Sequence, residues 1–191
     1  MVHSTEYDAV VVGAGPNGLT ASITLAKEGY SVLLVEGKET IGGGTRTREL
    51  TLPGFLHDVC SAIHPVGAAS PVFRSLDLIG HELDWVYSPA ALAHPLDDGT
   101  AITLERSISD TAESLGTDSG SYLKLMNPLV QNWENLATDL LGPLRLPKNP
   151  IQYINFGRNA VRSVNSLAKS YFKGERAQAL IAGLGAHSIM T

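Results

Sequence analysis

The stretch Tyr7-Asp-Ala-Val-Val-Val-Gly-Ala-Gly-Pro-Asn-Gly-Leu19, followed by Ser31-Val-Leu-Leu-Val-Glu36, decides the fold class of this chain. It has the pattern of an apolar strand, a glycine-rich turn, a helix and a second apolar strand that ends in an acid, all within about 30 residues. Strands that alternate with a helix in this way form parallel sheets. The sequence therefore predicts an α/β fold that begins with a Rossmann-like βαβ unit.

The glycines of the first turn have separate physical roles. Gly13 allows the tight turn out of the strand, Gly15 lets the backbone approach a pyrophosphate, and Gly18 lets the helix pack close to the sheet. The unpaired N–H groups and the positive dipole end of the following helix would face the phosphates. We therefore predict a dinucleotide site at the turn. Its residues are Gly13, Ala14, Gly15, Pro16, Asn17 and Gly18.

An acid and a second glycine cluster extend this prediction. Glu36 ends the second strand, where a carboxylate can accept hydrogen bonds from both hydroxyls of an adenosine ribose. Directly after it comes Gly37-Lys-Glu-Thr-Ile-Gly-Gly-Gly-Thr-Arg-Thr47. A nicotinamide-binding domain normally continues from this acid into its next helix, whereas a second glycine turn suits a longer ligand. The cluster therefore favours a flavin dinucleotide.

Together the two motifs resemble the flavoprotein superfamily of amine oxidases and carotenoid (phytoene) desaturases. In that group a glycine pair follows the acid by six and seven residues, as Gly42 and Gly43 do here. The resemblance implies FAD as the cofactor. Amine oxidases and many desaturases carry arginine directly after the pair, but this chain has Gly44 there and Arg46 two residues on. Arg46 is then either a phosphate contact from a shifted position or a solvated surface arginine.

Three further segments are similar to phytoene-dehydrogenase-related FAD oxidoreductases: residues 49–65, 93–99 and 186–188. This likeness implies oxidation or desaturation of an apolar organic substrate by hydride transfer to the flavin, although it cannot name the substrate. Members of that family are much longer, which implies that the chain is an N-terminal portion. Residues 1–59 would form the FAD-binding unit, and residues 60–191 the beginning of an incomplete substrate domain of mixed α and β structure.

Two other functions remain open. The chain could be a non-catalytic fragment that needs a complementary C-terminal segment. It could also belong to an NAD(P)-dependent dehydrogenase, which shares the first motif but gives the second glycine cluster no purpose.

No residue is assigned to catalysis, because a flavin supplies the chemistry and a catalytic base is optional. His57 and His64 flank Cys60 and are candidates for acid–base roles; the alternative that they hydrogen-bond their own loop is favoured. A zinc site at these three residues lacks a fourth ligand, so we expect no metal. Cys60 could be a nucleophile or a flavin attachment point, but a small buried residue is the favoured interpretation. His94 and His187 are family-like positions without an assigned role.

Composition limits the partners. The net charge is −5 with 43 % hydrophobic residues and no basic stripe, which argues against nucleic acid. One cysteine excludes an internal disulfide and fits a reducing compartment. We find no apolar leader and no run of ~18 apolar residues, so we expect a cytoplasmic protein. Membrane contact is suggested only by the resemblance to desaturases, since no segment forms a basic amphipathic helix.

The remaining pattern predicts a mixture of helices and short strands. An Asp-Asp-Gly-Thr sequence at residues 97–100 predicts a hairpin, and Asp118 or Ser119 could cap the clearest helix. The expected helices cover residues 17–28, 71–79, 107–115, 119–141, 152–172 and 175–183, and the expected extended segments cover residues 50–53, 55–59, 83–86, 91–96 and 101–104.

Overall fold

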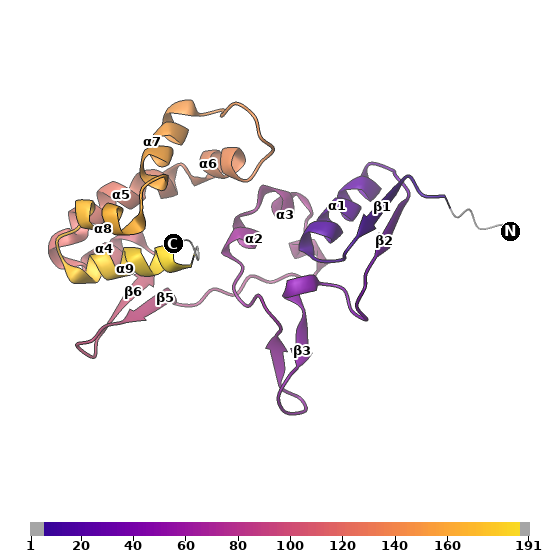
Figure 1. Ribbon diagram of the computed structural model, residues 1–191, viewed down its shortest axis with the longest axis horizontal. Coiled ribbons are helices and arrows are strands. Elements are labelled where there is room, and N and C mark those ends of the chain that lie inside the picture. Colours follow the sequence, from indigo (N-terminus) through magenta and orange to yellow (C-terminus); the bar gives the residue numbers. More distant parts are fainter. Residues whose placement is uncertain (1–5, 188–191) are drawn as a thin grey trace. The chain divides into compact units, whose positions relative to one another are not determined.

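The computed structural model describes residues 6–187, so Ser188 and the residues after it lie outside the described part. The chain has a mixed α/β fold, as predicted, and divides into two compact units between Glu82 and Leu83 (Figure 1). Residues 60–82 thus lie with the first unit. The functional boundary expected at residue 59 stays a prediction.

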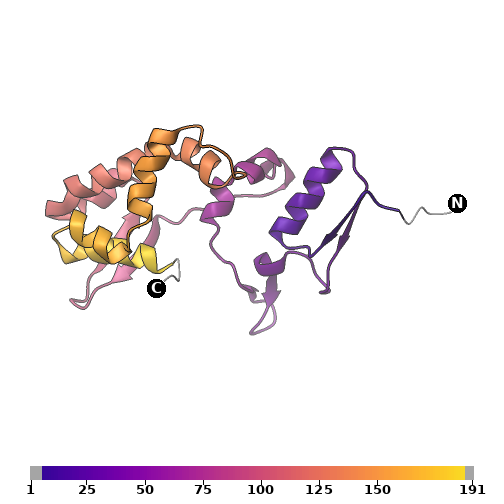
Figure 2. The same ribbon diagram turned by 45° about the horizontal axis from the view of Figure 1, so that its top comes forward.

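The first unit opens with the predicted βαβ arrangement. Strand β1 (Ala9–Val12) pairs in parallel with β2 (Val32–Val35), and Ala9 lies opposite Val32. Helix α1 (Pro16–Lys27) connects the strands and packs along them (Figure 2). Glycine just beyond a helical segment predicts a helix stop, and the helix does end before Gly29, whose φ is +90°.

The buried face of α1 differs from the expected one. The spacing of Leu19, Ile23 and Ala26 or Lys27 predicts an apolar stripe that faces the sheet, but Ile23 is 40 % exposed. Ser22 is buried instead, and Leu25 is half-buried. The close approach at Gly18 sets this rotation, because residues at spacings of three and four lie on one helix face.

Beyond β2 the chain forms short elements around turns. A 3₁₀ helix, η1 (Gly43–Thr45), leads into an antiparallel hairpin of β3 (Thr47–Glu49) and β4 (Leu56–Asp58). The extended segment expected at residues 50–53 is wrong, because the hairpin turns there. The helix expected at residues 71–79 ends early. The unit then contains α2 (Pro65–Ala69), α3 (Pro71–Ser75) and η2 (Ile79–His81).

The second unit begins with the predicted hairpin of β5 (Ala90–Pro95) and β6 (Ala101–Glu105). Asp98 accepts hydrogen bonds from the backbone N–H of Thr100 at 2.9 Å and from its hydroxyl at 2.6 Å, which confirms a turn-forming role. The strand expected at residues 83–86 is wrong: Val86 is 92 % exposed in irregular chain.

Helices make up the rest of this unit, and two expected long helices are each broken. Asn132 ends one, because its side-chain amide bonds the carbonyl oxygen of Pro128 at 2.7 Å and competes with the helix backbone. Ser163 starts a new helix by accepting the N–H of Ser166 at 3.2 Å. The helices are α4 (Ile108–Glu113), η3 (Gly116–Asp118), α5 (Ser119–Gln131), α6 (Trp133–Leu140), α7 (Pro150–Ala160), α8 (Val164–Tyr171) and α9 (Glu175–Ala186).

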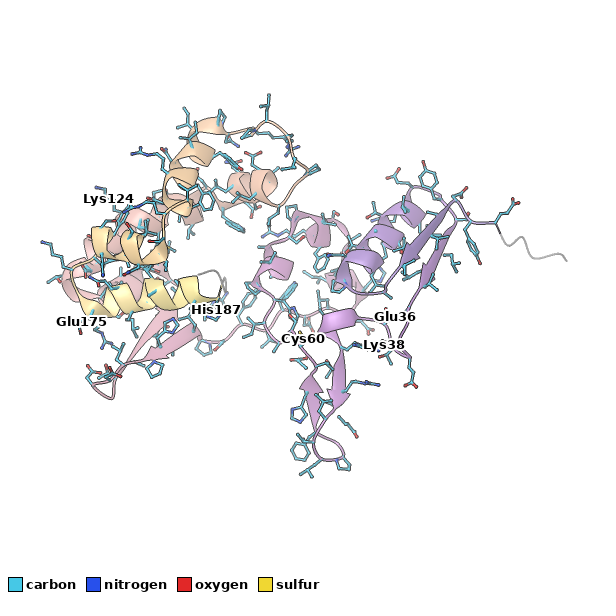
Figure 3. All side chains as sticks on the ribbon, in the orientation of Figure 1. Glu36, Lys38, Cys60, Lys124, Glu175 and His187 are labelled. Carbon is cyan, nitrogen blue, oxygen red and sulfur yellow. The ribbon has the colours of Figure 1, made fainter. Side chains whose placement is uncertain are left out.

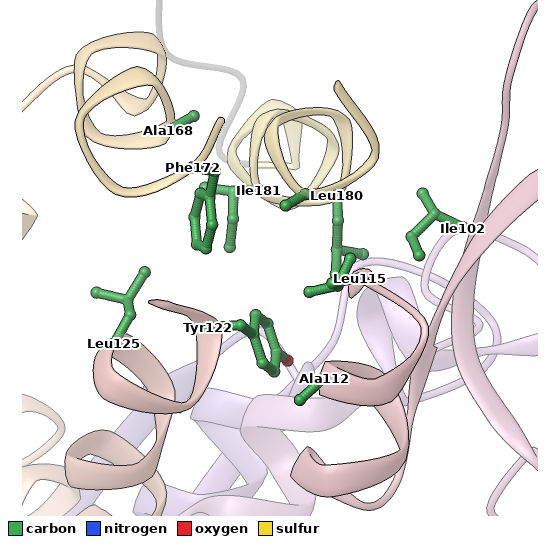
Figure 4. Close-up of a cluster of buried hydrophobic side chains, with 10 residues drawn as sticks. Ile102, Ala112, Leu115, Tyr122, Leu125, Ala168, Phe172, Leu180 and Ile181 are labelled. Atoms are coloured by element: carbon green, nitrogen blue, oxygen red, sulfur yellow. The ribbon is translucent and has the colours of Figure 1, made fainter. Parts of the chain in front are cut away.

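The main apolar core belongs to the second unit, where α8 packs against α5 and α9, and α9 packs against β6 (Figure 4). Its members are Ile102, Ala112, Leu115, Tyr122, Leu125, Ala168, Phe172, Ala177, Leu180 and Ile181. By contrast, one face of the β1–β2 pair stays open, with Val12 84 % exposed. A two-stranded parallel pair with one helix covers only one face.

Asp118 links two distant segments of the second unit. Its carboxylate is buried and accepts the backbone N–H groups of Lys173 at 3.0 Å and Gly174 at 2.6 Å. It is the N-cap residue of α5, at the position that the sequence predicts, but its side chain makes no capping bond to the start of that helix. Asp118 instead stabilises the connection between α8 and α9.

Candidate functional site

The turn that follows β1 is held against the end of β2. Gly13 donates its N–H to the carbonyl oxygen of Val35 at 2.7 Å and has a φ of +97°, which glycine adopts without strain. Gly18 lies against the same turn, because a Cβ atom there would overlap the carbonyl oxygen of Gly13. Both glycines therefore serve the geometry that the sequence predicts for them.

The N-terminus of α1 is open to a ligand from the side of its N-cap. The N-cap residue Gly15 has no side chain that could cap the helix, and Pro16 occupies the first helical turn, where its missing N–H costs nothing. The first turn of α1 contains no acidic residue, and Asn17 is exposed. The positive end of this helix is thus available to an anion.

Glu36 is fixed at the end of β2 by the first turn and by its own loop (Figure 3). Its Oε2 atom accepts the N–H of Ala14 at 2.8 Å, and its Oε1 atom accepts the N–H of Lys38 at 2.9 Å. These bonds, that of Ala14 foremost, lower the pKa of Glu36 below its ordinary value of 4.5. Each carboxylate oxygen keeps a further lone pair, so two hydroxyl donors can still bind.

The second glycine turn contacts the first. Gly42 donates its N–H to the carbonyl oxygen of Ala14 at 2.7 Å. Gly43 lies so close to Gly15 that a Cβ atom on it would be 2.9 Å from the Cα atom of Gly15. Both residues of the pair have positive φ, +110° and +55°. The two motifs, about 30 residues apart, therefore form one continuous backbone surface.

Arg46 is part of this second turn. Its Nε donates to the carbonyl oxygen of Gly43 at 2.7 Å, and its side chain is half-buried. Its charge also contributes to the lowered pKa of Glu36. Arg46 is thus held beside the glycine pair and not fully solvated, whereas its contact with a phosphate stays a prediction.

The histidines near the turn hydrogen-bond within their own loops. His57 bonds the hydroxyl of Thr51 at 2.8 Å, and His64 bonds that of Ser61 at 3.2 Å. Cys60 is exposed, so the expectation of a buried cysteine is wrong; a side-chain Cβ at Gly44 would lie 3.8 Å from its sulfur. Within residues 6–187 no three His, Cys, Asp or Glu side chains form a cluster that could hold a metal.

Two other histidines lie in the second unit. His94 is packed beneath α9 at Gly183, and its Nε2 atom is buried without a hydrogen-bond partner in the described structure. His187 is exposed at the end of α9. Across the described ranges, no helix has the length and apolar character that crossing a membrane requires.

The structure adds backbone contacts that side-chain patterns do not encode. Ala14 is fully buried and uses both backbone polar groups between the two motifs, one on Glu36 and one on Gly42. The Lys38 N–H also holds Glu36. In the sequence, only the spacing between the first glycine turn and Glu36 could have indicated these backbone contacts of Ala14 and Lys38. The assembled site offers glycine backbone, an open helix N-terminus and one ionised carboxylate, which suits a ligand with phosphates and a ribose.

Comparison with known proteins agrees with this geometry. Residues 11–77 match the family model for an NAD(P)-binding Rossmann-like domain. Among solved structures, a putrescine oxidase variant is similar to this chain with a TM-score of 0.51 and 22 % identity. The superposition covers 92 % of this chain and 36 % of the oxidase. At this identity the similarity shows the fold alone.

Curated relatives match along shorter parts of their own chains. A limonene dehydrogenase subunit of Castellaniella defragrans is 28 % identical over 138 residues, which are 72 % of this chain and 25 % of the relative. Pyridine nucleotide-disulfide oxidoreductase domain-containing protein 2 of Mus musculus is 34 % identical over 62 % of this chain and 19 % of its own. Digeranylgeranylglycerophospholipid reductase of Methanosphaerula palustris is 46 % identical over 62 % of this chain and 24 % of its own. The chain thus spans about a quarter or less of these relatives.

Proposed function

We propose that this chain carries the cofactor-binding segment of an FAD-dependent oxidoreductase related to the amine oxidases and carotenoid desaturases. One observation carries the proposal: the second glycine turn contacts the first through the Gly42–Ala14 hydrogen bond and the approach of Gly43 to Gly15. The names of the relatives, which include a dehydrogenase, a reductase and an oxidoreductase domain protein, support the reaction class.

The residues present fit FAD at several points. Gly15 and the open start of α1 would hold the pyrophosphate, and Glu36 would accept the adenosine ribose hydroxyls. Gly42 and Gly43 present backbone without side chains beside the same phosphates. Arg46 supplies a positive charge next to them.

These residues bind and orient the cofactor; they do not carry out the oxidation. A bound flavin accepts a hydride or electrons from the substrate. The contribution of this chain is to keep Glu36 ionised through two backbone N–H donors and to fix both glycine turns in one geometry. Positioning of this kind is the role that a protein has in flavin chemistry.

An NAD(P)-dependent dehydrogenase is the second candidate, favoured by the match of residues 11–77 to an NAD(P)-binding domain. A substitution at the glycine pair would not separate the two candidates. A side chain on Gly43 would press on Gly15 and so disturb the first turn, which either dinucleotide would use. The ligands must therefore be compared directly.

The test is cofactor retention by the purified 191-residue chain. We expect an FAD absorption band that survives desalting, with no comparable retention of NAD⁺ or NADPH. The sharpest variant is Gly15→Ala, because a Cβ atom there meets nothing closer than 3.8 Å and the backbone φ of −76° is ordinary. The methyl group would stand where the pyrophosphate should approach. We expect FAD affinity to fall about tenfold or more, as for one lost charge-assisted hydrogen bond.

Gly37→Ala is the matched control, because this glycine lies in the neighbouring loop after β2, with nothing within 4 Å of an added Cβ atom and without a positive φ. It should bind FAD as the parent chain does. Equal FAD affinity for Gly15→Ala and Gly37→Ala would refute the proposed site, and preferential retention of NAD(P) would favour the second candidate.

We also propose a substrate class and a reaction for the complete enzyme. The substrate is an apolar organic molecule, oxidised or desaturated in a phytoene-dehydrogenase-like reaction. The similarity of residues 49–65 and 93–99 to that group supports this proposal. Because the chain spans about a quarter of its curated relatives, turnover would require a complementary C-terminal segment. Adding that segment should restore substrate-dependent bleaching of the flavin.

A further inference from the structure

The second unit contains a cleft of its own, which is lined by residues of that unit alone. It has a volume of about 520 Å³ and lies among α5, α6, α7 and α8. Small-molecule sites commonly measure about 300–1,000 Å³, so the cleft is large enough for an organic ligand. All of its lining residues belong to residues 124–171.

Two helix faces give the cleft an apolar side and an amide-rich side. On α5, Leu125 and Leu129 are four residues apart and lie on one face. On α7, Gln152 and Asn155 share a face with Phe156 in the same way. An apolar body can therefore rest on the leucines and Phe156 while polar groups meet the amides.

The charge at the cleft is positive. Its lining includes Lys124, which Figure 3 places on α5, together with Arg158 and Arg162, and no acidic residue of the described chain lines it. Arg162 is held in place, since its guanidinium donates to the Ser170 hydroxyl at 2.8 Å. Residues 140–174 contain six lysines and arginines and no acid, in a chain whose net charge is −5. The cleft thus favours an anion.

One buried acceptor in the lining has no partner within the described residues: Oε1 of Gln152. The orientation of this amide is fixed by a chain of bonds. Asn132 donates to the carbonyl oxygen of Pro128 at 2.7 Å, so its own oxygen is free to accept the Nε2 group of Gln152 at 2.6 Å. This leaves Oε1 of Gln152 as an acceptor. A buried acceptor without a donor is costly, so a ligand donor would be favoured there.

We propose that this cleft binds an amphipathic organic anion: an acidic head group on an apolar body that also carries a hydrogen-bond donor. Lys124 and Arg158 attract the acidic group, the leucines and Phe156 hold the apolar body, and Gln152 accepts the donor. The proposal does not depend on FAD, because no residue of the glycine turns lines the cleft.

The experiment uses 11-(dansylamino)undecanoate with the 191-residue chain. This probe combines a carboxylate, an apolar chain and a sulfonamide N–H, and its fluorescence rises and shifts to the blue in an apolar site. We expect saturable binding that weakens as salt is added, and much weaker binding of its uncharged methyl ester. The titration is repeated with FAD present, which should leave it unchanged.

Exposed charges in the lining allow variants that keep the fold. Lys124→Gln and Arg158→Gln should each weaken binding about threefold, and the double variant about tenfold, because exposed ion pairs are weak and additive. Lys169→Gln is the matched control: this lysine is exposed in the same acid-free segment as Arg158 but does not line the cleft. Circular dichroism should show the same fold for every variant.

Three results would overturn the proposal: no saturable binding, equal affinity for the methyl ester, or an equal loss in Lys169→Gln. Loss of FAD binding with intact probe binding would contradict only the proposed cofactor function. The two proposals can therefore fail separately.

Discussion

Replacing Gly18 with alanine tests the central packing feature of the glycine-turn site. Gly18 lies in the first turn of α1, where its missing side chain lets the helix approach the preceding turn. A Cβ atom there would overlap the carbonyl oxygen of Gly13 and lie 3.0 Å from the carbonyl carbon of that residue. Both obstacles are backbone atoms, so neither can turn away as a flexible side chain would.

We expect Gly18→Ala to destabilise the first unit, although the same replacement in a helix usually stabilises it. Alanine in place of glycine within a helix normally stabilises by about 0.5–1 kcal/mol. At Gly18 the helix must instead move away from the turn, and overpacking of this kind costs about 1–3 kcal/mol. We expect a net loss of about 1–2 kcal/mol in the first unit, which corresponds to a factor of about 5–30 in its unfolding equilibrium.

Hydrogen exchange followed by mass spectrometry measures this change in the first unit alone. Peptides that cover β1 and α1 should exchange about 5–30 times faster in the Gly18→Ala variant, provided that exchange follows unfolding of the unit. Gly157→Ala in α7 is the control, because that helical glycine has nothing within 4 Å of its added Cβ atom. It should slow exchange in the second unit.

The reasoning would be refuted if Gly18→Ala exchanged as slowly as the parent chain, or more slowly. The helix and the turn would then have room for a methyl group, and the third glycine would have no packing role.

Three further outcomes follow from described contacts. The pKa of Glu36 lies below its ordinary value of 4.5, so its stabilisation of the first unit is complete above that pH and is lost as pH falls through the lowered pKa. Glu36→Gln should therefore flatten acid unfolding below about pH 4.5, and an unchanged profile would contradict this. Asp118→Ala leaves the half-buried N–H of Gly174 unpaired and should cost about 1–3 kcal/mol in urea unfolding followed by tryptophan fluorescence; a cost below about 1 kcal/mol would argue against the contact. Gly183→Ala should lower the melting temperature of the second unit, because its Cβ atom would overlap the ring of His94, and the added change His94→Ala should relieve that loss; no relief would reject the overlap.

Local signals in the sequence predicted the βαβ unit and the second hairpin well. Gly13, Gly29 and Gly99 each adopt the positive φ that their turns require. Such signals act over a few residues, so a pattern can encode them. The fold class follows from the same local rules, whereas the grouping of both glycine motifs at one site is implied by the resemblance to flavoproteins.

Other features depend on contacts between distant segments. The face of α1 was predicted wrongly because Gly18, and not the larger apolar residues, sets how the helix meets the sheet. The break at Asn132 comes from one side-chain bond to Pro128. Asp118 has the sequence context of a helix cap but binds N–H groups 55 and 56 residues away. Periodicity carries no information about such pairings.

The two bonds of Ala14 have a kinetic consequence. Since its N–H holds Glu36 and its carbonyl oxygen holds Gly42, folding of the first unit already brings both binding loops to their final separation. A dinucleotide then meets a preorganised surface and loses little affinity to the ordering of loops. Stopped-flow association should accordingly show a single phase whose rate rises linearly with ligand concentration, without a slow step that saturates.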